Sequence, residues 1–314
     1  MAVRQMQLEV RTLVMGGAPA GGIMTDERLM HAERAGSGDR RMSADLTESG
    51  DTVLRVERDG PLVILTIDDP GTRNALSPLL TRELVAACDA INADMSVGCV
   101  ILTASGDVFC AGGNLKDMYA RANHFAGNAA EIRRTYLTGV QTIARALHDL
   151  EVPSIAAVNG AAMGAGMDFA TMCTMRIASD RAKFAESFIK LGLTSAAGGA
   201  WFLTRAIGQS AAAEMALTGD TLDAKQALAI GLVSRVVQHE ALLDEAKALA
   251  ARITRHPMHS IRLNTRLLRD SARLDLHAAL EIAAGMQAIV QQTDDQHEAV
   301  AAVVERRVPA FTGR

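Results

Sequence analysis

The sequence predicts an α/β fold with a mainly parallel sheet, followed by a helical region. Between residues 53 and 178, short apolar runs alternate with stretches of helical periodicity, which is the order typical of parallel βα units. Two of the runs, 99–103 and 154–158, are almost entirely apolar, as expected for strands that a sheet buries on both faces. After about residue 211 only helical periodicity remains.

Local signals place the elements of the α/β part. Residues 53–57 and 62–67 are expected to pair as a hairpin, because a turn signal at residues 59–61 separates them. Ser77 is a favourable N-cap and Pro78 a favourable first residue, so a helix is expected from there to about residue 94. The other expected elements are strand 99–103, helix 129–150, strand 154–158, helix 164–172 and strand 175–178.

The chain is expected to have three parts. Residues 1–52 carry little periodicity and several glycine breaks, which predicts a disordered N-terminal extension. An α/β core over 53–210 and a helical region over 211–314 follow it. The helices expected in the last part cover residues 221–231, 242–253, 257–268, 274–290 and 294–305.

Composition excludes several functional classes. The 314 residues are 49% hydrophobic and 22% charged, and the net charge of −4 offers no basic surface to nucleic acid. The longest weakly polar stretch, 154–170, is too short and too rich in glycine to span a bilayer, so no membrane association is expected. The four cysteines fit neither a metal-binding spacing nor a CxxC motif. They predict buried thiols in a reducing cytoplasm, with no metal site.

Two glycine-rich clusters follow the two buried strands, at residues 109–118 and 159–168. Ligands of open α/β sheets bind at the carboxyl ends of strands, and small residues let a ligand approach free backbone N–H groups. The second cluster also starts a helix, whose first N–H groups lack partners. One N–H group from each cluster can therefore hold a carbonyl oxygen that becomes an oxyanion. A dinucleotide-binding fold is the rival interpretation, but the GxGxxG spacing and its acidic residue are missing.

The two clusters resemble the oxyanion loops of the crotonase, or enoyl-CoA hydratase/isomerase, superfamily. Segments 73–76, 184–199, 213–220 and 227–233 also match, so the resemblance extends from about residue 53 to the end of the chain. It implies a crotonase-like spiral of ββα units with a C-terminal helical trimerisation region, assembled as a homotrimer or a dimer of trimers. It also implies an acyl-CoA thioester substrate, with coenzyme A as part of that substrate and no separate cofactor.

The resemblance assigns roles to individual residues. The two oxyanion N–H donors fall on Gly113 and Ala165, and the first catalytic acid falls on Asp168. The position of the second acid falls on Phe188, which cannot transfer a proton. Glu186, two residues earlier, shares a face with that position in an extended segment and is a further candidate acid. The CoA-contacting stretches fall on Arg73, Ala75, Leu76, Leu115 and Lys116, and the expected wall of the acyl pocket includes Phe188 and Trp201.

The missing second acid leaves more than one function open. Hydration needs a base for the water and an acid for the α-carbon, whereas one carboxylate can shift a double bond, so a single Asp168 favours isomerisation. We expect an enzyme that stabilises a thioester enolate and isomerises or hydrates an enoyl-CoA. The alternative is a non-catalytic acyl-CoA-binding or scaffold protein on the same fold. A nucleic-acid-binding protein of this fold is disfavoured by the acidic charge balance.

Overall fold

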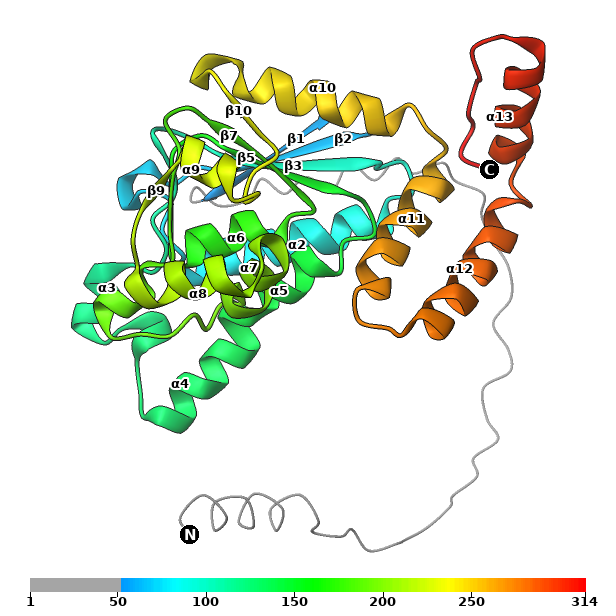
Figure 1. Ribbon diagram of the computed structural model, residues 1–314. Helices are drawn as coiled ribbons and strands as arrows, with labels where there is room; N and C mark the ends of the chain where they lie inside the picture. The colour runs from blue at the N-terminus through cyan, green and yellow to red at the C-terminus, as the bar shows by residue number, and fades with distance from the viewer. Residues whose placement is uncertain (1–51) are drawn as a thin grey trace, which may run out of the picture. The chain divides into compact units, whose positions relative to one another are not determined.

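The computed structural model describes residues 52–314, which form two β-sheets covered by helices (Figure 1). The extension predicted over residues 1–52 lies outside the described residues, apart from Thr52. The larger sheet is parallel except for the predicted β1–β2 hairpin, whose turn contains Gly60 at φ 55°. Its strands, in spatial order, are β1 (Leu54–Asp59), β2 (Leu62–Ile67), β3 (Cys99–Ala104), β5 (Ser154–Val158), β7 (Met175–Ser179) and β10 (Arg235–Val237).

A smaller sheet of four strands completes the predicted spiral. Each of β3, β5 and β7 is followed directly by a strand of the smaller sheet, and each such pair of strands is followed by helix. The chain therefore repeats a ββα unit, which confirms the fold class predicted from the sequence. The strands of the smaller sheet, in spatial order, are β4 (Val108–Cys110), β6 (Ala161–Met163), β8 (Lys183–Ala185) and β9 (Leu222–Asp223).

Both faces of the inner strands of the larger sheet are buried, because their successive side chains enter two different apolar clusters. Ile64 and Ile101 pack in the cluster that includes α10 (Leu242–Thr254). Their neighbours Leu65 and Leu102 pack in the other cluster, with α2 (Pro78–Ala93) and α5 (Gln141–His148). Figure 1 shows α10 on one side of the strands and α2 and α5 on the other. Burial on both sides explains the nearly continuous apolar runs of β2 and β3.

The helices begin where the sequence provides caps. The Ser77 Oγ accepts a hydrogen bond from the Leu80 N–H at 3.1 Å, as predicted for the start of α2. The remaining helices are α3 (Leu115–Ala120), α4 (Ala129–Thr135), α6 (Ala165–Met172), α7 (Gly199–Ile207), α8 (Gln209–Thr218), α9 (Ala224–Ala229), α11 (Met258–Ser271), α12 (Leu276–Val290) and α13 (Asp294–Glu305). Short turns are η1 (Pro70–Thr72), η2 (Asn123–Phe125), η4 (Ser187–Leu191) and η5 (His239–Ala241), and η3 (Tyr136–Val140) is π-helical.

Two expectations from periodicity are wrong. The segment predicted as one α-helix over 129–150 is instead α-helix, π-helix and α-helix in succession. The π-helical η3 lies between α4 and α5 and adds a residue to one turn. The region after residue 211 is not purely helical, since β9 joins the smaller sheet and β10 pairs with β7 of the larger one. Strands of two or three residues are too short to show an alternating pattern.

The described residues carry neither a membrane span nor a disulfide. Among residues 52–314, no helix has both the length and the apolar character needed to cross a bilayer. All four cysteines are buried free thiols, as predicted, and burial raises the pKa of Cys88, Cys99 and Cys110 to about 12. Thiols with such a high pKa stay protonated at neutral pH and are poor nucleophiles.

A buried arginine attaches α11 to the α/β core. The Arg262 guanidinium donates hydrogen bonds to the backbone carbonyls of Ile91, Asp94 and Val97, at the end of α2 and the start of β3. It also pairs with the Glu151 carboxylate at 3.2 Å, although only 4% of the Arg262 side chain is exposed. One side chain therefore satisfies several carbonyl groups that the turn after α2 leaves without helical partners.

We predict that Arg262→Ala lowers the free energy of unfolding by about 3 kcal/mol, because it leaves buried carbonyls and the Glu151 carboxylate unpaired. Urea denaturation of the purified variant measures this loss. Arg266→Ala is the matched control, since the Arg266 side chain is 42% exposed and lies 3.8 Å from the same carboxylate. The control is expected to change stability by less than about 0.5 kcal/mol. Equal effects of the two variants would contradict the anchoring role of Arg262.

Candidate active site

The two glycine-rich clusters meet backbone to backbone. A methyl group built on Gly112, which has φ 84°, would lie 2.5 Å from the Met163 carbonyl oxygen and 3.3 Å from the Ala165 nitrogen. A methyl group built on Gly166 would collide with the Cys110 carbonyl oxygen. Only glycine allows both approaches, so these positions explain why each cluster is rich in glycine.

The proposed N–H donors lie on either side of this contact. Gly113 forms an isolated parallel bridge with Leu76, in which the Leu76 N–H donates to the carbonyl of Gly112. In this parallel bridge, the residues on either side of Gly113 make the hydrogen bonds to Leu76. The N–H group of Gly113 itself therefore points away from Leu76. Ala165 is the first residue of α6 and follows Gly164, which has φ 51°. Its N–H group has no partner within the helix, so both donors are available to a ligand.

Gly113 and Ala165 line one small cavity of about 30 Å³. Phe188, assigned to the acyl-pocket wall, lies in the same lining, and its ring approaches Gly164. A volume of this size holds only one or two water molecules, so a bound acyl chain must displace side chains. The other residues of this inner cavity are Leu76, Met118, His124, Phe125, Tyr136, Val140, Leu193 and Ala197.

The segment assigned to coenzyme A runs beside the first glycine cluster. The Arg73 carbonyl accepts from the Ala111 N–H, and the Leu76 N–H donates to the Gly112 carbonyl, so this segment lies along 111–113. Arg73 is exposed and has φ 62°, whereas Ala75 and Leu76 are buried. Leu115 and Lys116 are exposed at the start of α3, where the Asn114 side chain caps the helix. The fold thus brings all five assigned residues to the rim of the oxyanion loops.

The two candidate acids lie together in the interior. Asp168 is on α6, one turn after Ala165, and Glu186 follows β8; neither side chain has more than 1% exposure. A methyl group built on Gly199 would touch Asp168 Oδ1 and would lie 2.5 Å from Glu186 Oε1 and 2.6 Å from Ser195 Oγ. Because glycine has no side chain, position 199 leaves free the space in which the two carboxyl groups meet.

Burial raises the pKa of Asp168 well above its usual value, and the Glu186 carboxylate beside it raises it further. Burial also raises the pKa of Glu186, against the lowering effect of its hydrogen bond with Asp168. No side-chain donor of the described residues is bonded to any of the four carboxylate oxygens. Two adjoining buried carboxylates repel each other when both are ionised, so burial and this repulsion favour a state in which the pair keeps a proton.

Sequence reasoning missed three residues of this region. Ser195 and Gly199 border the acids, and His124 lines the inner cavity beside the N–H donors. His124 follows the first glycine cluster by six residues but belongs to no motif, so only the fold reveals that it reaches the cavity. Gly199 had a signal, because it is the second glycine of a pair that begins α7. Neither acid lines the inner cavity; Phe188 and Ala197 stand on that side instead.

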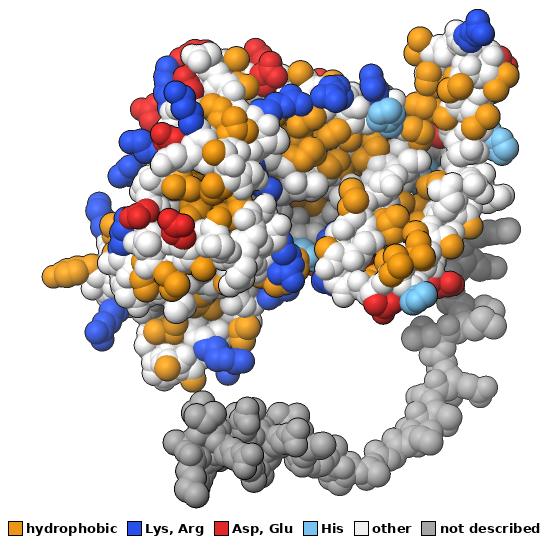
Figure 2. All heavy atoms as spheres, in the orientation of Figure 1, with side chains coloured by type: hydrophobic (Ala, Val, Ile, Leu, Met, Phe, Trp, Pro, Cys, Tyr) orange, Lys and Arg blue, Asp and Glu red, His pale blue; other side chains and the backbone are white. Residues whose placement is uncertain are grey.

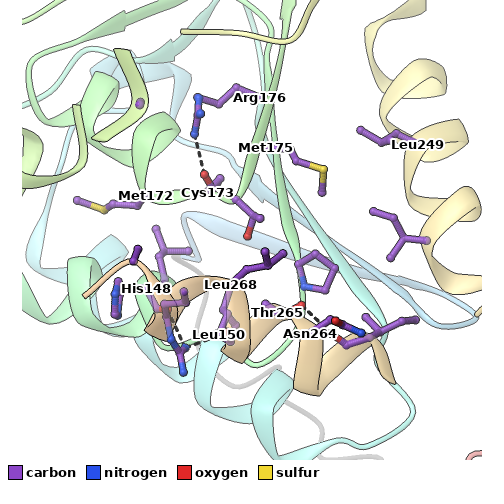
Figure 3. A pocket seen from close by; sticks show the side chains of 18 of the residues that line it. His148, Leu150, Met172, Cys173, Met175, Arg176, Leu249, Asn264, Thr265 and Leu268 are labelled. Carbon is purple, nitrogen blue, oxygen red and sulfur yellow. Dashed lines mark hydrogen bonds between the residues drawn. The ribbon is translucent and has the colours of Figure 1, made fainter. Parts of the chain in front are cut away.

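Trp201, also assigned to the acyl pocket, lines a different groove of about 860 Å³ at the far end of α6. The Arg205 guanidinium stacks on its ring at 3.8 Å, and the Phe202 ring lies 4.7 Å away. Figure 3 shows this groove, whose lining includes Met172, Cys173 and Leu268 of α11. Since α6 separates the groove from the oxyanion donors, Trp201 does not contact the inner cavity in this structure. Among residues 52–314, no cluster of His, Cys, Asp and Glu has the arrangement of a metal site.

Comparisons with known proteins identify the family to which this chain is similar. Residues 57–314 match a family model described as enoyl-CoA hydratase/isomerase. The crotonyl-CoA hydratase of Syntrophomonas wolfei is 35% identical over 260 residues, covering 82% of this chain and 97% of that protein. The 2,3-dehydroadipyl-CoA hydratase of Escherichia coli is 33% identical over 261 residues, covering 83% and 99%. The crystal structure of an enoyl-CoA hydratase from Bacillus anthracis matches with a TM-score of 0.78 and 29% identity, covering 83% of this chain and all of that one.

The raised pKa of Asp168 predicts how stability depends on pH. Above the ordinary carboxyl pKa of 3.8, the folded acid pair retains a proton that the unfolded chain has lost, so stability falls as pH rises through this range. Asp168→Asn cannot ionise. We therefore predict that the variant gains stability relative to the wild type by up to about 1 kcal/mol per pH unit between pH 5 and 7. Urea denaturation at several pH values measures both slopes.

Asp294→Asn, at an exposed carboxylate in the first turn of α13, is the control for this experiment. It is expected to keep the slope of the wild type. Parallel pH profiles for the wild type and Asp168→Asn would show that Asp168 shares no proton in the folded protein.

Proposed function

The chain belongs to the enoyl-CoA hydratase/isomerase family, and we propose that it isomerises or hydrates the double bond of an enoyl-CoA. The backbone N–H groups of Gly113 and Ala165 bind the thioester oxygen and stabilise the enolate that forms there. The observation that carries this proposal is the meeting of the two glycine loops, which brings Gly113 and Ala165 into the lining of a single cavity.

The acid pair supplies the proton transfer. Asp168 lies three residues after Ala165 on α6, so the two residues share one face of the helix. A thioester oxygen held by the Ala165 N–H places the neighbouring acyl carbons near this face. In isomerisation, the ionised member of the pair takes a proton from the chain, the thioester becomes a dienolate, and the proton returns to another carbon. In hydration, water adds its oxygen to the β-carbon and the α-carbon receives a proton. Glu186 holds the second carboxyl of the pair in either reaction.

The residues around the loops fit an acyl-CoA. Arg73 and Lys116 are exposed cations at the rim and are placed to meet phosphate groups, and Ala75, Leu76 and Leu115 border the path of the pantetheine. The chemistry uses groups of the chain and the thioester, so we propose no separate cofactor. Relatives named crotonyl-CoA hydratase and 2,3-dehydroadipyl-CoA hydratase support an enoyl-CoA as the substrate class. The four buried free thiols support a reducing, cytoplasmic location.

A second candidate is a non-catalytic acyl-CoA-binding protein. Phe188 at the position of the second acid favours it, as does the absence of both acids from the lining of the inner cavity. Both candidate proteins bind acyl-CoA, but only the enzyme converts it to a product.

The test compares a 2-enoyl-CoA with a 3-enoyl-CoA as substrates, followed by absorbance of the conjugated thioester and by chromatography of the products. We expect turnover of at least one, and Asp168→Asn is expected to lower kcat by about 100-fold, since general acid–base catalysis contributes at least that much. Asp294→Asn is expected to retain wild-type turnover. Tight acyl-CoA binding without turnover would favour the non-catalytic protein, and turnover unchanged in Asp168→Asn would remove Asp168 from the proposed mechanism.

We also propose that the chain assembles as a trimer or a dimer of trimers through its C-terminal helices. α12 has no buried residue, and Leu276, Leu280 and Ile289 on it are each more than half exposed. Figure 2 shows apolar side chains gathered over α12 and α13. Exposed apolar surface of this extent is typical of protein interfaces, and a second copy of this chain is the partner that the family resemblance implies.

Sedimentation velocity tests the assembly. The wild type is expected to sediment at three or six times the mass of one chain. Leu280→Lys is expected to shift the protein to single chains, because it places a charge in the apolar contact. Gln291→Lys, an exposed polar position at the end of the same helix, is the control and should leave the assembly intact. A wild type that sediments as a single chain would exclude the proposed trimer.

A further inference from the structure

His124 is a buried imidazole beside the proposed oxyanion donors, and neither the motifs nor the proposed mechanism uses it. It lies in η2, between α3 and α4, and only 6% of the residue is exposed. It lines the inner cavity together with Gly113 and Ala165. Because that cavity has a volume of about 30 Å³, a group bound next to the two N–H donors is also next to this ring.

The two ring nitrogens of His124 have different surroundings. The Ser77 backbone lies beside the ring and raises its pKa, as a carbonyl facing a ring N–H does, whereas Nε2 is buried and has no partner. Burial lowers the pKa of the ring and keeps it neutral. In a neutral imidazole, a nitrogen that donates to a backbone carbonyl carries the single proton, which leaves the other nitrogen as an acceptor. Nε2 therefore presents an unused lone pair.

The orientation of the ring separates these two nitrogens. His124 stands between the inner cavity and an outer groove of about 620 Å³ that Gly139 lines. A methyl group built on Gly139 would lie 3.9 Å from both Nδ1 and Cε1, so this edge of the ring faces the outer groove. Because His124 also lines the inner cavity, the opposite edge of the ring, with Nε2 and Cδ2, lies toward that side.

An unpaired buried acceptor is costly, and native proteins rarely keep one without a ligand or a water to satisfy it. Most of the cavity is apolar: apart from His124, the only lining side chain with a polar atom is Tyr136. The cavity is therefore built for an acyl group that is largely apolar but carries one hydrogen-bond donor.

We propose that Nε2 of His124 accepts a hydrogen bond from a hydroxyl group of the bound acyl chain, so that the site selects hydroxyacyl-CoA thioesters. This role rests on the proposed binding of acyl-CoA at Gly113 and Ala165. The hydroxyl has two possible sources: it is the group that water addition creates on the β-carbon, or it is a substituent further along the chain. His124 is a specificity-determining residue in both cases.

Isothermal titration with three saturated four-carbon thioesters tests the proposal. The probes are butyryl-CoA, 3-hydroxybutyryl-CoA and 4-hydroxybutyryl-CoA. The wild type is expected to bind one hydroxyacyl-CoA about 10-fold more tightly than butyryl-CoA, as expected for one satisfied hydrogen bond. Preference for the 3-hydroxy compound assigns the hydroxyl to the hydration product, and preference for the 4-hydroxy compound assigns it to a substituted substrate.

Variants attribute the preference to the ring. His124→Leu is expected to abolish the 10-fold preference while butyryl-CoA still binds, and His124→Gln, which keeps an acceptor, is expected to retain part of it. His256→Leu, at an exposed histidine outside the cavity, should keep the full preference. If His124→Leu does not fold, the comparison of ligands on the wild type and on His124→Gln still decides the outcome.

Three results would overturn the proposal. Equal binding of all three thioesters would exclude a hydroxyl partner and leave the proposed function intact. Loss of the preference in Tyr136→Phe but not in His124→Leu would assign the hydroxyl to the phenol. Failure of every thioester to bind would remove the proposed function, and this inference with it.

Discussion

The contact between the two glycine loops is the constraint on which the rest of the site depends. Gly112 approaches the backbone at Met163 and Ala165, and Gly166 admits the Cys110 carbonyl, each at a distance that a Cβ atom forbids. β4 and β6, which lead into these loops, pair in the smaller sheet and so fix the loops side by side. The spiral of ββα units is thus what brings two N–H groups, 52 positions apart in the sequence between Gly113 and Ala165, to one cavity.

The acid pair, unlike the contact between the glycine loops, destabilises the folded protein. Asp168 and Glu186 are buried without side-chain donors, and their raised pKa values mean that this part of the interior opposes folding at neutral pH. Carboxyl groups with raised pKa values cluster at sites of proton transfer, which is why we assign this pair the proton-transfer role in the proposed function. Gly199 keeps the space open, so any larger residue there would separate the acids or expel them from the interior.

The sequence predicts the larger elements and the loops well, because caps, breakers and apolar runs are local signals. Ser77, the turn at Gly60 and the buried runs of β3 and β5 each specify their structure within a few residues. The smaller sheet was not predicted, since its strands have two or three residues and are defined only by their neighbours. The side chains around the acyl cavity depend on the fold as well: Phe188 reaches it, Trp201 lies beyond α6, and His124 arrives from a loop without a motif.

The inner cavity is too small for an acyl chain, so a chain that binds there must move the side chains that line it. The cavity holds only one or two water molecules, and its lining includes neither Asp168 nor Glu186. A methyl group built on Gly113 would touch Met118, and Phe125 would lie 3.3 Å from that methyl group, so these two side chains pack directly against Gly113. Methionine changes rotamer easily. Met118, Phe125 and Phe188 all line this cavity, so an acyl chain that enters it must displace some of these side chains. Phe188, which stands where the family pattern has its second acid, therefore contributes an aromatic ring to the cavity and no carboxyl group.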